Sequence, residues 1–140
     1  MIETQSIEFK SRWKPEFLPE ICGMANSDGG QILIGKDDEG NTIGLSDKEL
    51  RYLLPDLPNS ISQTMKLHNI SLTVEEDGNG RYLVVTVPKS DHVVFYRGVM
   101  YRRIGATNLM VEGLDMQNAL LGQRNASWDS QTVDGLAIDP

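Results

Sequence analysis

The spacing of apolar residues predicts a helix and two strands in the first third of the chain. Residues 5–10 alternate between polar and apolar side chains, which is typical of a strand with one buried face. Residues 16–27 carry apolar side chains at helical spacing, and the Asn and Gly residues within 26–30 favour the left-handed backbone that ends a helix. Residues 31–35 are almost continuously apolar, so they predict a central strand covered on both faces.

The middle of the chain predicts a turn followed by a longer helix. Residues 36–41 have the composition of a turn, and residues 42–45 are able to return as a short strand. Ser46 and Glu49 form a capping box that opens a helix over residues 47–66. Two prolines lie inside that segment, and we expect them to break or kink the helix.

Two hairpins and a closing helix are predicted in the remainder. The first hairpin joins strands at residues 71–76 and 81–88 through an Asp-Gly-Asn-Gly turn. The second joins residues 93–96 and 100–104, and apolar spacing over residues 108–122 indicates a closing helix. We therefore expect the α+β class, with a mixed, mostly antiparallel β-sheet and about three helices packed on it.

Length and composition favour one domain. The chain has 140 residues, of which 39% are hydrophobic, and this is enough for a single core. We expect the domain to occupy residues 1–124, and residues 125–140 to be a linker to a further C-terminal region. Cys22 is the only cysteine, so no internal disulfide is possible, which fits a cytoplasmic protein. No apolar run approaches the length of a membrane span.

Charge is unevenly distributed along the chain. The formal net charge is −7, which argues against an indiscriminately basic nucleic-acid binder. Residues 81–105, however, hold five basic residues against Asp91 alone, a local charge of +4, so the rest of the chain carries −11. A basic stripe on an acidic body is a footprint for phosphate contact. A solvated hairpin with outward-facing arginines is the simpler interpretation of the charge alone.

Aromatic residues lie among these cations. Tyr96 precedes Arg97, and Tyr101 precedes two further arginines, a combination that suits stacking on bases and pairing with phosphates. A hairpin with Tyr101 half-buried is the alternative. The candidate nucleic-acid-binding residues are Lys10, Lys89, Arg97, Tyr101, Arg102 and Arg103.

A set of acidic residues is the second candidate site. Glu3 and Glu8 flank the first predicted strand, and Asp37, Asp38 and Glu39 follow the central strand. If those strands are neighbours, two to four carboxylates would converge at one sheet end. Such a set suits Mg²⁺ or Mn²⁺ and metal-dependent phosphodiester cleavage. Ordinary turn chemistry explains the same residues without a metal.

The Gly29-Gly30 turn is not a phosphate loop. Such loops place their glycines between a strand and the start of a helix, whereas here the helix comes first. His68 and His92 are isolated in the sequence, with no second ligand at metal spacing and no nucleophile beside a base. The residues to which we assign structural roles are Asn26, Gly29, Gly30 and Gly35.

Taken in order, these motifs resemble the Schlafen/AlbA-like DNA-binding domain over about residues 3–122. The likeness is carried by Glu8-Phe9-Lys10, residues 21–30, residues 32–38, Ile43-Gly44, residues 85–90 and residues 96–108. Many bacterial members are N-terminal domains of transcriptional regulators, and some carry helicase-related or ATP-binding names. The resemblance thus implies a nucleic-acid-binding domain, with DNA favoured over RNA and no cofactor required. The sequence has no Walker motif, so it does not support an ATPase.

The same resemblance implies a second possibility. Schlafen proteins include ribonucleases that cleave transfer RNA, with an acidic triad whose matching residues here are Glu3, Glu8 and Asp38. Those three would be catalytic and would bind Mg²⁺ or Mn²⁺. Lys36 departs from the family pattern, which usually has an apolar residue there. The Schlafen nuclease also uses two such lobes, so a homodimer would have to supply the second. A protein-interaction or oligomerisation module is the third hypothesis.

Overall fold

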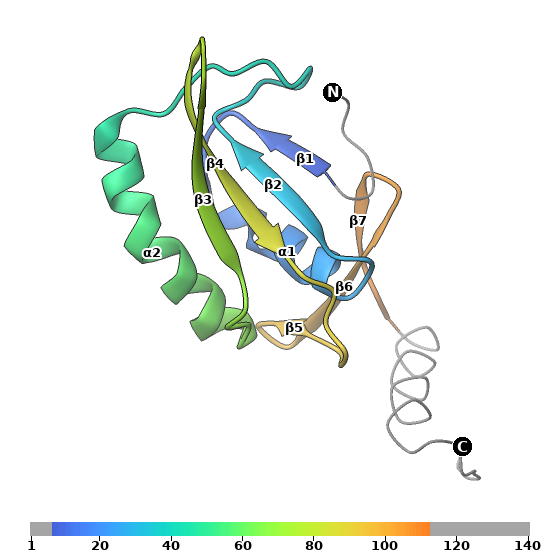
Figure 1. Ribbon diagram of the computed structural model, residues 1–140. Coiled ribbons are helices and arrows are strands. Elements are labelled where there is room, and N and C mark those ends of the chain that lie inside the picture. The colour runs from blue at the N-terminus through green and yellow to red at the C-terminus, as the bar shows by residue number, and fades with distance from the viewer. Residues whose placement is uncertain (1–6, 113–140) are drawn as a thin grey trace, which may run out of the picture.

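The computed structural model describes residues 7–112, which contain two α-helices and seven β-strands (Figure 1). In chain order the elements are β1 (Ile7–Lys10), the 3₁₀ turn η1 (Pro15–Phe17), α1 (Leu18–Ala25), β2 (Gly30–Ile34), α2 (Asp47–Met65), β3 (Ser71–Asp77), β4 (Gly80–Val87), β5 (Phe95–Tyr96), β6 (Val99–Ile104) and β7 (Thr107–Met110). The α+β class is confirmed, with two α-helices within residues 7–112 where about three were expected for the domain. Neither described helix is long and apolar enough to cross a membrane.

The predicted closing helix is wrong where it begins. Thr107–Met110 instead form strand β7, which pairs antiparallel with β6, so that Arg103 lies opposite Asn108. The tight turn between the two strands passes through Gly105, whose φ of 62° suits glycine. The rest of the expected helix, the candidate ligand Glu3 and the expected linker at residues 125–140 lie outside the described residues.

A four-stranded sheet forms the centre of the fold, in the order β1-β2-β4-β3. β1 runs parallel to β2, with α1 in the connection between them, whereas β2–β4 and β4–β3 are antiparallel. Glu8 lies opposite Ile32, which in turn lies opposite Val85. The apolar run after the Gly-Gly turn is therefore a central strand, as predicted.

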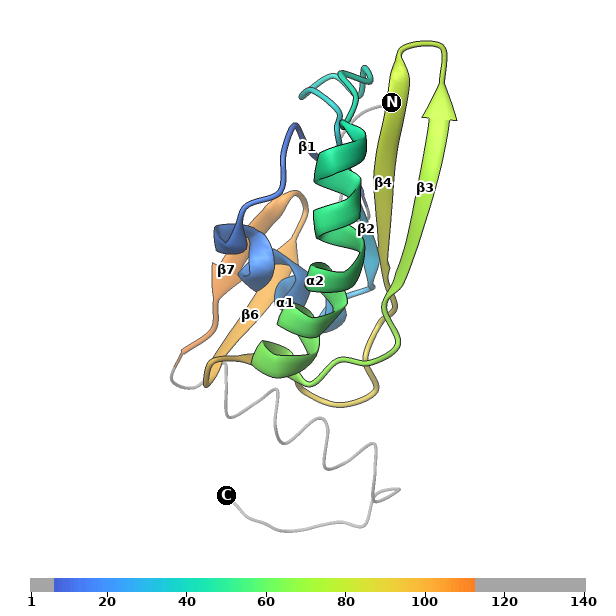
Figure 2. The same cartoon turned by 90° about the vertical axis from the view of Figure 1, so that its left-hand side faces the viewer.

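Both helices cover the same face of this sheet (Figures 1 and 2). The smaller sheet, in the order β5-β6-β7, packs against α1, so that α1 lies between the two sheets (Figure 2). Ile21 of α1, Ile32 of β2, Val85 of β4 and Ile61 of α2 have no exposed surface. Burial of one such side chain stabilises the fold by about 1.5–3 kcal/mol, so this core holds both helices to the sheet.

The long helix α2 begins where its sequence predicts. Ser46 accepts a hydrogen bond from the Glu49 amide, and the Glu49 carboxylate accepts one from the Ser46 amide, which completes the capping box. The expectation of a break in the middle is wrong, because α2 is continuous through Pro55 and Pro58, both on its exposed side. Its other side buries five apolar residues at intervals of three and four, and this packing offsets the cost of the prolines.

The turn after α1 joins the two sheets. The side-chain NH₂ of Asn26 donates to the carbonyls of Val94 and Tyr101, and its side-chain oxygen accepts from the Val94 amide. The Ser27 hydroxyl donates to the Arg103 carbonyl and accepts from the Arg103 amide. Asn26 has a right-handed backbone, so it acts through its side chain rather than as a left-handed cap. At Gly29, φ is +76°, and a Cβ there would lie 2.6 Å from the Val87 carbonyl oxygen. Only glycine fits that position.

Candidate nucleic-acid interface

The basic segment 81–105 separates into paired and unpaired cations once it is folded. Arg81 of β4 forms an ion pair with Asp47 at the start of α2. Arg103 of β6 is 2% exposed and pairs with Glu8 of β1 at 2.8 Å. Lys89, Arg97 and Arg102 are exposed, and none has a carboxylate within ion-pair distance among the described residues. Three of the five cations therefore remain available to a phosphate.

Two of the predicted nucleic-acid contacts belong instead to a network of charges inside the fold. Lys10 lies 3.3 Å from a Glu8 oxygen and 3.0 Å from a Glu20 oxygen, while Arg103 holds the other Glu8 oxygen. The Lys10 ammonium also lies 4.1 Å from the centre of the Phe17 ring. Lys10 and Arg103 are thus corrected from surface contacts to residues that join β1, α1 and β6.

Burial and charge act in opposite directions on the pKa values of Glu20 and Lys10, the two partly buried members of this network. Burial raises the pKa of Glu20, against the hydrogen bond and charge of Lys10. Burial also lowers the pKa of Lys10, but the hydrogen bond and charge of Glu20, with those of Glu8, outweigh it and the net shift is upward. Since Lys10 stays protonated, the two cations Lys10 and Arg103 are balanced by the two carboxylates Glu8 and Glu20. The network is therefore not a basic surface.

Tyr101 is half-buried and packs against the core. Its ring lies 6.4 Å from that of Tyr96, over which the Arg97 guanidinium is placed at 5.6 Å. Stacking on a base is therefore limited to the exposed part of Tyr101, because Tyr96 on the adjacent strand β5 also packs against the core. The outward face of β6 carries Arg102, opposite Leu109, whose side chain is 44% exposed.

One basic residue of this region was missed in the sequence. Lys66 follows the last turn of α2, and the Arg97 amide donates a hydrogen bond to the carbonyl of Thr64, two residues before it. The connection after β4, strand β5 and the C-terminal end of α2 thus meet at one end of the molecule (Figures 1 and 2). We call Lys66, Lys89 and Arg97 the basic end. No sequence signal marks Lys66, because only the fold brings it to the same end as Lys89 and Arg97, which are 23 and 31 positions later.

The acidic candidate site is incomplete in the part of the chain that the structure describes. Glu8 gives its oxygens to Arg103 and Lys10, and Asp38 is exposed in the turn after β2. Among residues 7–112, no three His, Cys, Asp or Glu side chains gather closely enough to hold a metal ion, and Glu3 lies outside that range. Glu8 of β1 is paired with Arg103 of β6 and with Lys10, whereas Asp38 lies in the turn that follows β2.

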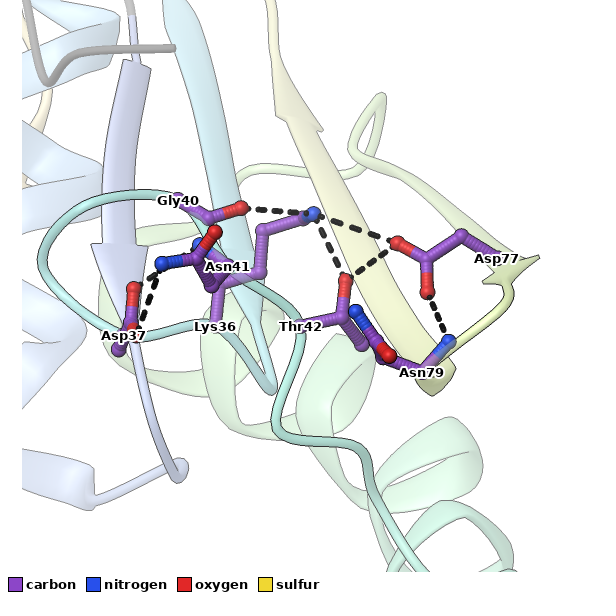
Figure 3. Close-up of polar contacts among 7 residues, drawn as sticks. All are labelled: Lys36, Asp37, Gly40, Asn41, Thr42, Asp77 and Asn79. Carbon is purple, nitrogen blue, oxygen red and sulfur yellow. Dashed lines mark hydrogen bonds and ion pairs between the residues drawn. The ribbon is translucent and has the colours of Figure 1, made fainter.

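Turn chemistry accounts for the residues that follow β2 (Figure 3). The Asp37 carboxylate accepts hydrogen bonds from the amides of Asn41 and Glu39, and these lower its pKa. Lys36, the departure from the family pattern, is 6% exposed; its ammonium donates to Gly40 and Thr42 and lies 4.0 Å from the centre of the Tyr82 ring. Its ammonium therefore closes the turn.

Gly35 has the structural role expected of it. Its φ is +107°, and a Cβ there would lie 3.1 Å from the Leu45 side chain and 3.2 Å from that of Tyr82. The Gly35 amide bonds the Lys10 carbonyl, and its own carbonyl accepts from Ile43. This residue fixes where the chain leaves β2, and so the position of the turn in Figure 3. For Gly30, the first residue of β2, the backbone is not left-handed.

The fold is an α+β domain built on a mixed four-stranded sheet, and comparison with known proteins identifies its family. The family model of the Schlafen AlbA_2 domain matches residues 3–112, so the chain belongs to that family. No curated protein matches the chain.

Two solved structures show the same fold. One is the DIP2311 protein from Corynebacterium diphtheriae, with 20% identity and a TM-score of 0.60 over 77% of this chain. The chain spans about a quarter of that protein's length, 25%. The other is the N-terminal domain of a protein from Nitrosomonas europaea that is named as related to the ATP-dependent DNA helicase RecG. It has 24% identity and a TM-score of 0.52, covering 77% of this chain and 82% of that domain.

Proposed function

We propose that this domain binds nucleic acid, DNA in preference to RNA, through Lys89, Arg97 and Arg102. The observation that carries the proposal is that these three cations are exposed and unpaired among the described residues, on a chain whose net charge is −7. An acidic protein gains little solubility from leaving cations without carboxylate partners, and such cations are the groups that neutralise phosphates.

The family supports an association with nucleic acid, and DNA rather than RNA is our proposal. The Schlafen AlbA_2 family and the helicase-related name of the Nitrosomonas protein both indicate association with nucleic acid. We infer that the domain positions a cytoplasmic bacterial transcriptional regulator on DNA, as many members of the family do. The three cations would contact the backbone rather than the base edges, since two of them lie on loops at one end.

A salt titration of duplex binding tests the proposal. Fluorescence anisotropy with a labelled duplex should give a dissociation constant that rises steeply with salt, with a log–log slope of roughly 0.9 per neutralised phosphate. The double variant Arg97→Asn/Arg102→Gln should weaken binding by about 10-fold or more. Asparagine is chosen at residue 97 because φ there is +49°, a region that asparagine tolerates.

A matched variant controls for net charge. Lys48→Gln/Arg51→Gln removes the same two charges from exposed positions on the first turns of α2, outside the basic segment. It should bind the duplex within about 2-fold of the wild type. An RNA duplex of the same sequence provides the second comparison. If no binding is seen at low salt, or if both double variants bind alike, the proposal is wrong.

A further inference from the structure

The fold brings the two histidines of the chain to one cleft. The cleft has a volume of about 470 Å³ and lies between residues 66–69, which follow α2, and residues 89–92, which follow β4. His68 and His92 both line it, although 24 positions separate them in the sequence. Lys66 and Lys89 line it as well. Four side chains able to carry positive charge therefore face one cavity at the basic end.

Most of the residues that line the cleft are polar, and the cleft is held in shape from both sides. Ser90 donates its amide to the Ala25 carbonyl at the end of α1, and its hydroxyl accepts from the His92 amide. On the other side, the Lys66 amide bonds the Ser62 carbonyl, and Lys66 has a left-handed backbone with φ of 59°. Among the described residues that line the cleft, Leu67 is the one apolar residue. The walls are thus anchored to α1 and α2 rather than formed by an isolated loop.

Each imidazole is held through the same ring nitrogen. Nδ1 of His68 lies 3.1 Å from the Ser62 hydroxyl, and Nδ1 of His92 lies 2.8 Å from a carboxylate oxygen of Asp91. That leaves Nε2 of each ring as the nitrogen available to a ligand. The charged groups that face the histidines from either segment are Lys66, Lys89 and Asp91. Asp91 offsets one positive charge, so the cleft is cationic whether or not the histidines are protonated.

We propose that this cleft binds a phosphate group, with Lys66 and Lys89 supplying constant charge and His68 and His92 supplying charge that rises as the pH falls. That the phosphate belongs to a nucleic-acid backbone rests on the proposed function. Imidazoles change charge between about pH 5 and 8, and a protonated ring adds both a donor and a positive charge for a phosphate oxygen. Duplex binding should accordingly tighten with falling pH.

Binding measured at two pH values tests this inference. At constant ionic strength the wild type should bind a labelled duplex about 10-fold more tightly at pH 6 than at pH 8. The variant His68→Gln/His92→Gln should bind within about 2-fold at the two pH values, close to the pH 8 affinity of the wild type. As a control, Arg102→Gln should weaken binding at both values by a similar factor and keep the pH dependence.

Titration with inorganic pyrophosphate tests whether the cleft binds a free phosphate compound as well as the phosphates of a nucleic-acid backbone. In NMR spectra it should move the ring-proton signals of His68 and His92, and Lys66→Asn/Lys89→Gln should abolish that movement. If pyrophosphate moves the signals but no duplex binds, the phosphate site stands with a free phosphate ligand and the proposed function is wrong. If the duplex binds equally at both pH values, or if the histidine variant keeps the full pH dependence, the inference is overturned. Absence of any signal movement with pyrophosphate also overturns it.

Discussion

Arg102 and Arg103 are neighbours in the chain but occupy opposite environments. Arg102 is exposed on the outer face of β6, with no carboxylate partner among the described residues. Arg103 is 2% exposed on the inner face and pairs with Glu8, 95 positions away. Successive strand residues point to opposite faces, so one position of register decides which arginine meets solvent. Counting the basic residues of a segment therefore overestimates how many of them are exposed.

The largest expected effect is on stability, when the buried Arg103 side chain is replaced. Arg103→Met should lower the free energy of unfolding by about 3 kcal/mol or more, because it removes the guanidinium that pairs with the buried Glu8 carboxylate. Arg102→Met, one residue away, should change it by less than about 0.5 kcal/mol. Urea denaturation followed by circular dichroism measures both.

A double variant at Glu8 and Arg103 keeps the comparison testable even if Arg103→Met does not fold. If Arg103→Met does not fold, Glu8→Gln/Arg103→Met should, since it removes the uncompensated charge and leaves a neutral amide. Equal stability of Arg103→Met and Arg102→Met would show that the ion pair contributes nothing and that the contrast between the two arginines is wrong.

The second effect is on DNA binding, where replacing Arg102 should matter more than replacing Arg103. Arg102→Gln should reduce the slope of the salt dependence by about 0.9, because one phosphate contact is lost. Glu8→Gln/Arg103→Met, assayed well below its melting temperature, should keep the wild-type slope. Anisotropy titrations between low and moderate salt give both slopes. A reduced slope in the Arg103 variant but not in Arg102→Gln would place the interface on the opposite face.

The sequence predicts local elements better than it predicts which distant residues meet. The apolar run of β2, the capping box of α2 and the Asp-Gly-Asn-Gly hairpin depend on neighbours in the chain, and all three are confirmed. The start of the predicted closing helix is wrong because a short apolar pair at residues 109–110 fits a strand as well as a helix. The partners of Arg103 and the cleft between the histidines depend on tertiary contacts, for which a single sequence holds no signal.

A smaller effect is expected at Asp77, whose side chain is 42% exposed. The Thr42 hydroxyl donates to Asp77 at 2.6 Å and, with the Asn79 amide and Lys36, lowers the pKa of that carboxyl (Figure 3). A lowered pKa in the folded state means that the stabilisation is present above the ordinary value and is lost as the pH falls. Between about pH 5 and 2 the wild type should lose more stability than Asp77→Asn.

The control for that measurement is the next carboxylate on the same strand. Glu76 is exposed and accepts no hydrogen bond among the described residues, so Glu76→Gln should follow the wild-type acid curve. If Asp77→Asn and Glu76→Gln give the same curve, the contact with Thr42 does not contribute. Thermal unfolding at a series of pH values is sufficient for all three proteins.

The smallest expected effect is on RNA cleavage, for which we expect none. Wild-type protein incubated with structured RNA and Mn²⁺ should leave it intact, because both oxygens of Glu8 are engaged by Arg103 and Lys10. A metal would have to displace an arginine that is 2% exposed, and the buried guanidinium would then lose its ion pair with Glu8. Mn²⁺-dependent cleavage that disappears in Asp38→Ala would contradict this and assign the acidic set to catalysis. Cleavage that persists in Asp38→Ala would come from another site or a contaminant. Such cleavage would leave the structural role of Glu8 intact, and the contrast between Arg102 and Arg103 with it.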